Sequence, residues 1–200
     1  MKKICKAKNF GLDIETTGIL NIINNETDIK KFKKGRLALF NLNFLSIDSL
    51  IIVSNLINKG AQGFISFDTT KSDHGCIAAK EMGMNFYSIS KKNKNILSYE
   101  NKTITLRDKI IFAGKGKKQK NIKNILLKKI KTQHKVKINL GFPSLIKKNK
   151  NVVSLCDGVG FSRIEFLLSQ ILNNIHPKKY LEINGLKKFS NEIANYLRPA

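Results

Sequence analysis

Residues 71–84 read Lys-Ser-Asp-His-Gly-Cys-Ile-Ala-Ala-Lys-Glu-Met-Gly-Met, a polar approach to a histidine followed by small and apolar residues. Ser72 and Asp73 are residue types that cap the N-terminus of a helix. The apolar residues that follow recur at helical spacing, and Gly83 is placed to end the helix. The stretch therefore predicts a short helix that begins at His74.

The N-terminal position of His74 has chemical consequences. The first turn of a helix has unpaired N–H groups and a partial positive charge, which favours an anion by roughly 0.3–1 kcal/mol. A histidine is nucleophilic near neutral pH, so His74 is a candidate carrier of a phosphoryl group. The alternative is a surface histidine or a satisfied core histidine, because no partner base is visible nearby.

Residues 74–84, HGCIAAKEMGM, resemble the phosphohistidine segment of the PEP-utilising enzymes, T-[SC]-H-A-A-I-[VI]-A-R-E-L-G-I. In that family the histidine carries the phosphoryl group on a swivelling domain. The resemblance implies that His74 is the catalytic residue, and Ser72 and Asp73 are candidates to support the phosphohistidine loop. The family has G-G-x-T-[SC] before the histidine, whereas this chain has Thr-Lys-Ser-Asp.

A second block lies in the C-terminal part of the chain. Residues 157–168, DGVGFSRIEFLL, resemble D-G-[VI]-G-L-x-R-x-E-[FH]-[LM]-[IL], the opening of the PEP/pyruvate-binding barrel in the same family. Residues 136–144 resemble the preceding strand, and IHPKKYLE resembles a segment typical of the phosphoenolpyruvate synthase branch. The resemblance implies that Arg163 contacts the phosphoryl group of PEP. From the residues alone, Arg163 suits an anion site or a structural pair with Glu165.

The expected fold is α/β. The resemblance implies a swivelling phosphohistidine β/α domain over residues 1–115. A basic linker (116–135) and the first strands of an incomplete TIM-type (β/α) barrel (136–200) follow. Residues 28–34 are interpreted as a polar bridge and 91–95 as a solvated loop. Apolar patterns predict a helix over 46–59 and strands over 19–23, 37–40, 63–67, 85–89, 102–106, 109–112 and 136–140.

Composition adds a net charge of +23, from 37 Lys and Arg against 14 Asp and Glu. We favour codon bias as its cause, because Arg is scarce and nucleic-acid surfaces usually recruit Arg. A basic nucleic-acid-binding face over residues 114–150 is the alternative. The three cysteines form no metal or disulfide pattern. No apolar run approaches the ~20 residues that a membrane span needs, and no secretory signal is visible, so we expect a cytoplasmic protein.

The resemblance implies phosphoryl transfer between ATP, His74 and pyruvate or PEP, with Mg²⁺ on the substrate. ATP would act through a separate nucleotide-binding domain. A complete barrel needs roughly 250 residues, and the family's later metal ligands have no counterpart here. We therefore expect complementary subunits or a homo-oligomer to supply the missing parts. The alternatives are a basic nucleic-acid-binding protein and an inactive remnant of a PEP-utilising enzyme.

Overall fold

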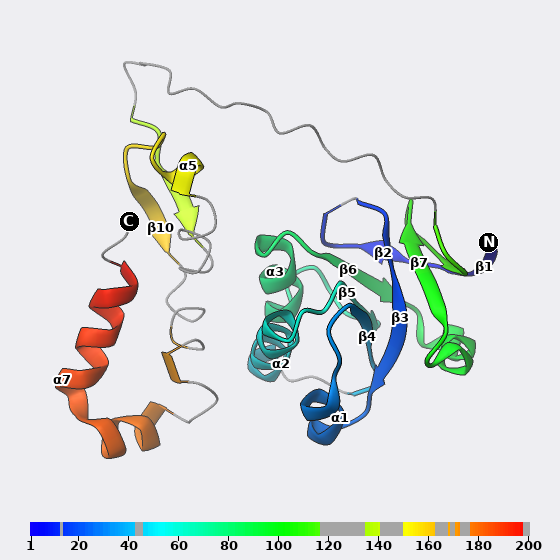
Figure 1. Cartoon of the computed structure of the whole chain (residues 1–200), viewed down its shortest axis with the longest axis horizontal. Coiled ribbons are helices and arrows are strands. Elements are labelled where there is room, and N and C mark those ends of the chain that lie inside the picture. The colour runs from blue at the N-terminus through cyan, green and yellow to red at the C-terminus, as the bar shows by residue number, and fades with distance from the viewer. Residues whose placement is uncertain are drawn as a thin grey trace. The chain divides into compact units, whose positions relative to one another are not determined.

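The structure is a computed structural model that describes residues 1–12, 14–42, 46–116, 135–140, 150–162, 168, 171–172 and 177–197. The chain divides into two compact units, Met1–Lys120 and Asn121–Ala200 (Figure 1). The boundary between the units falls inside the segment predicted as the basic linker.

The first unit is built on one eight-stranded sheet in the order β1-β8-β7-β3-β4-β5-β6-β2. The four strands β3 to β6 are parallel, and antiparallel strands extend the sheet on both sides. The strands are β1 (Lys2–Lys6), β2 (Lys8–Asn9), β3 (Thr16–Ile23), β4 (Arg36–Phe40), β5 (Gly63–Phe67), β6 (Asn85–Ile89), β7 (Thr103–Arg107) and β8 (Ile110–Ala113).

Helices connect the successive parallel strands. They are α1 (Glu26–Lys31), α2 (Ser46–Asn58) and α3 (His74–Glu81), and the 3-10 helix η1 (Lys91–Tyr99) joins β6 to β7. Crossovers between parallel strands are right-handed, and the order β3, β4, β5, β6 advances in one direction, so the three α-helices cover the same face of the sheet. On that face α2 and α3 pack side by side (Figure 1).

The N-terminal segment closes the sheet on itself. β1 pairs with β8 at one edge, where Lys6 lies opposite Ile110, and β2 pairs with β6 at the other edge, where Lys8 lies opposite Ser88. Only Ala7 separates the two strands, so one bent segment completes both edges of the sheet. Closure removes the unpaired N–H and C=O groups that an open edge would present.

Each face of the sheet has its own core, because alternate residues of a strand point to opposite sides. On the helix-covered face, Phe40, Phe64 and Phe86 lie on adjacent strands with ring centroids 5.8–6.3 Å apart. Full burial of such a side chain stabilises the fold by about 1.5–3 kcal/mol. The inner face of the closed sheet is filled by Cys5, Leu20, Ile22, Leu37, Leu39, Ile65, Tyr87, Ile89, Ile96, Ile104, Leu106 and Ile111.

Two segments differ from the sequence prediction. The predicted polar bridge over 28–34 is wrong, because α1 spans its first half. Asn25 caps this helix by accepting hydrogen bonds from the backbone N–H groups of the next turn. The predicted loop over 91–95 is also wrong. It belongs to η1, which Ser90 caps and which buries Ile96 beneath it.

The second unit holds a short parallel pair, β9 (Ile138–Leu140) and β10 (Val159–Ser162), with the helices α5 (Lys150–Val153) and α7 (Pro177–Leu197). Gly185, with φ of +73°, interrupts α7. Tyr180 donates a hydrogen bond to Glu192 across this interruption and packs against Phe189, with ring centroids 5.7 Å apart. Both units combine strands with helices, so the predicted α/β class is confirmed.

Candidate functional site

His74 is the first residue of α3, in the connection that leaves the carboxyl end of β5. The predicted helix is confirmed at both ends. Asp73 caps its start, and Gly83 follows its end with φ of +73°, a conformation that favours glycine. The imidazole is half-buried, so part of it remains accessible to a reactant.

A hydrogen-bonded lock holds the residues around His74. Asp73 Oδ1 accepts from Ser49 Oγ of α2 at 2.7 Å and from the backbone N–H of Gly75 at 2.8 Å. The same N–H of Gly75 also donates to Ser49 Oγ at 3.0 Å. The lock therefore ties the start of α3 to α2 and fixes the backbone on both sides of His74.

Gly75 leaves the space that this lock needs. A Cβ at this position would lie 3.1 Å from Asp73 Oδ1, from Ser49 O and from Val53 Cγ2. The carboxylate of Asp73 consequently occupies the anion position at the start of α3. A phosphoryl group on His74 would have to use N–H donors other than that of Gly75.

Ser72, the other predicted support residue, does not cap the helix. It is exposed, and its hydroxyl lies 3.0 Å from the hydroxyl of Thr70. The backbone N–H of Asp73 donates to Thr70 O at 3.2 Å, which closes the turn that precedes α3. Ser72 therefore belongs to the turn that precedes α3.

A cavity of about 430 Å³ opens at the carboxyl ends of β4 and β5. Its lining includes Asp73 and, from the same connection, Asp68, Thr69 and Thr70. Lys91 and Lys94 of η1 complete the charged part of the lining. His74 is not among the residues that line the cavity. The sequence analysis missed this cavity, although a run of Asp and Thr directly after an apolar strand was the signal.

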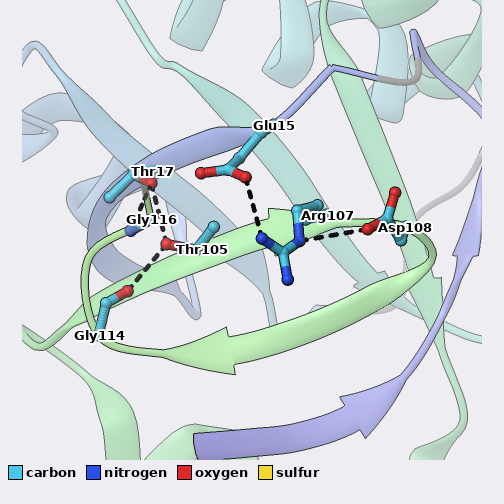
Figure 2. A network of polar contacts seen from close by, with 7 residues as sticks. All are labelled: Glu15, Thr17, Thr105, Arg107, Asp108, Gly114 and Gly116. Carbon is cyan, nitrogen blue, oxygen red and sulfur yellow. Dashed lines mark hydrogen bonds and ion pairs between the residues drawn. The ribbon is translucent and has the colours of Figure 1, made fainter. Parts of the chain in front are cut away.

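A second polar cluster lies on the neighbouring strands β3 and β7 and on the segments next to them, including the segment after β8 (Figure 2). The guanidinium of Arg107 lies 3.5 Å from Glu15 Oε2 and 3.2 Å from Asp108 Oδ2. Beside it, the hydroxyls of Thr17 and Thr105 are 2.9 Å apart.

The two threonines fasten the segment that leaves β8. Thr105 Oγ1 donates to Gly114 O at 2.8 Å, and the N–H of Gly116 donates to Thr17 Oγ1 at 3.4 Å (Figure 2). A Cβ on Gly116 would lie 1.9 Å from Glu15 Oε1. The cluster therefore holds residues 114–116 against the sheet, which is a structural role.

The remaining predicted site residue, Arg163, lies outside the described residues, as do His176 and most of the basic segment 116–135. Within the described ranges, no three His, Cys, Asp or Glu side chains gather closely enough to hold a metal ion. The described residues therefore offer no set of ligands for the Mg²⁺ that the resemblance implies.

Burial makes two of the thiols unreactive. It raises the pKa of Cys5 from its ordinary value of 9.0 to about 11, and it raises the pKa of Cys76, next to the candidate site, further still. The nearby carboxylate of Asp73 adds to the shift at Cys76. Cys76 is therefore a small core residue of α3 rather than a nucleophile.

The fold defines the class of this protein as α/β, and comparison with known proteins adds no family to that description. No protein-family model matches this sequence, and no curated protein matches it. In the part of the chain that the structure describes, every helix is too short or too polar to cross a membrane.

Proposed function

We propose that the first unit is a phosphoryl carrier of the PEP-utilising type, with His74 as the residue that is phosphorylated. The observation that carries the proposal is the position of His74. It is a partly accessible imidazole at the first residue of a capped helix, in the connection that follows the parallel strand β5. The order of the two sequence blocks, HGCIAAKEMGM before DGVGFSRIEFLL, supports it as well.

The proposed step needs a neutral imidazole. A ring nitrogen of His74 attacks the phosphorus of PEP, the bond between phosphorus and the enol oxygen breaks, and the enolate takes a proton to become pyruvate. The chain's own contribution is positional, because the lock of Ser49, Asp73 and Gly75 fixes the backbone that carries the ring. The same proposal includes Arg163 as the contact for the phosphoryl group of PEP and ATP as the second phosphoryl donor. It also includes a cytoplasmic location and partner subunits that supply the missing parts.

The test is incubation of the full chain with Mg²⁺ and PEP labelled with ³²P, followed by measurement of acid-labile, base-stable label. We expect label on His74, its loss in His74→Gln, and its retention in His134→Gln, a matched change at another histidine. If PEP gives no label, the same assay is repeated with ATP and a nucleotide-binding partner subunit. Absence of label under both conditions, or label that survives in His74→Gln, would refute the proposal.

A further inference from the structure

We propose that the cavity beside Asp73 is a binding site for a small phosphorylated polyol. His74 does not line the cavity, although Asp73, which holds the backbone beside His74, does. In α/β folds, ligands bind at the carboxyl ends of parallel strands, where loops converge. The cavity has that place, between the ends of β4 and β5 and the start of η1.

The charges that line the cavity define one end of the ligand. Lys91 and Lys94 are three residues apart in η1, and both line the cavity. With the described residues, neither ammonium group forms an ion pair. Lysine binds phosphate as a point charge, and two ammonium groups together suit a phosphate dianion. The proposed phosphate position is therefore the side of the cavity that η1 forms.

The loop after β5 adds groups for ligand hydroxyls to the same cavity. Asp68 has a left-handed backbone with φ of +47° at the end of β5, and its own N–H donates to Ile89 O at 2.8 Å. Its exposed carboxylate is an acceptor for the O–H groups of a ligand. Thr69 and Thr70 add hydroxyls, and Ser88 Oγ fixes the loop by donating to Thr69 O at 2.9 Å.

The size of the cavity sets the scale of the ligand. Since a water molecule takes about 30 Å³ of liquid, about 430 Å³ corresponds to about 14 waters. A three-carbon polyol phosphate enters such a space with room for bridging waters. The lining of hydroxyls, carboxylates and ammonium groups favours such a ligand over an apolar one.

The test is a titration of the ¹⁵N-labelled full chain with glycerol 3-phosphate, followed by amide chemical shifts. We expect saturable shifts confined to residues 41–42, 66–73 and 91–94, with a Kd of about 1 mM or below. Lys91→Gln/Lys94→Gln should weaken binding by about tenfold or more, because two charge-assisted contacts are lost. The matched control is Lys30→Gln/Lys33→Gln, which removes the same charge near the amino end of β4 and should change the Kd by less than about twofold.

Inorganic phosphate and glycerol test the two halves of the site. Both should bind at least about fivefold more weakly than glycerol 3-phosphate, since each makes only part of the contacts. Shifts scattered over surface lysines, equal losses in the two double variants, or phosphate binding as tight as glycerol 3-phosphate would overturn the proposal. The titration is repeated in His74→Gln, where an unchanged Kd separates this site from the phosphoryl carrier.

Discussion

Replacing Asp73 tests whether the lock at the start of α3 has the strength that its geometry implies. Asp73→Ala removes the acceptor of two hydrogen bonds, one of 2.7 Å from Ser49 Oγ and one of 2.8 Å from the N–H of Gly75. Loss of an N-cap costs about 1 kcal/mol, and loss of a hydrogen bond to a charged group costs about 1.5–3 kcal/mol. In Asp73→Ala the N–H of Gly75 keeps Ser49 Oγ as an acceptor. We therefore expect the free energy of unfolding to fall by about 2–3 kcal/mol, near the lower end of the summed range.

Asp73→Asn is the matched control. An asparagine keeps the Oδ1 acceptor and caps helices about as well as an aspartate, so it should cost less than about 1 kcal/mol. Ser49→Ala removes the other partner of this hydrogen bond. Together with the double variant Ser49→Ala/Asp73→Ala it completes a double-mutant cycle, which should show a coupling energy of about 1–2 kcal/mol.

The assay must report on the first unit alone, because unfolding of a chain with two units need not be two-state. Native-state hydrogen exchange of the buried amides of Phe64, Ile65, Phe86 and Tyr87 provides that free energy of unfolding. If Asp73→Asn lowers the free energy of unfolding as much as Asp73→Ala does, the carboxylate acts through its charge. The hydrogen bonds of the lock would then not be the source of its stability. A cost below about 0.5 kcal/mol for Asp73→Ala would equally refute the reasoning.

Four further predictions concern the core, the thiols and the segment after β8. Phe64→Ala should lower the free energy of unfolding of the first unit by about 3–5 kcal/mol, measured by the same exchange assay, while Phe189→Ala in the second unit should leave it unchanged. At pH 8 a thiol reagent should modify Cys156 in the native chain and all three cysteines after denaturation; rapid native labelling of Cys5 or Cys76 would contradict their burial. Because the folded pKa of Cys5 is about 11 against 9.0 ordinarily, the unfolded state loses its proton first. Stability should therefore fall as the pH rises from 9 towards 11, and more shallowly in Cys5→Ala, as urea titrations at each pH would show. Gly116→Ala should lower the free energy of unfolding by about 1–3 kcal/mol, because its Cβ would crowd Glu15 Oε1. Adding Glu15→Ala should recover part of this loss. A double variant no more stable than Gly116→Ala would show that the contact is unimportant.

The sequence predicted the elements whose signals are local. β5 and β6 match their predicted ranges, 63–67 and 85–89, because short apolar runs there are bounded by glycines and polar residues. The helix at His74 was predictable because its cap and its terminating glycine are both encoded within a few residues. α1 was missed because it has only six residues and depends on Asn25 for its start.

The features that depend on distant contacts were not predictable. β1 and β2 are rich in lysine, and their pairing with β8 and β6 can be recognised only once the sheet has formed. The partner of Asp73 in the lock is Ser49, on another helix, and no spacing in the sequence links them. The cavity arises from the ends of two strands and the start of η1, which are separated by many residues along the chain.

The pairing of β1 with β8 has a consequence for engineering this protein. Lys2 lies opposite Ala113, so the backbone enters the first unit and leaves it at neighbouring points of one strand pair (Figure 1). A short peptide could bridge these points, and new termini could then be opened in an exposed turn, which is the condition for circular permutation. Because these two points are neighbours, the first unit can also be inserted into a surface loop of a host protein without moving the two ends of that loop apart.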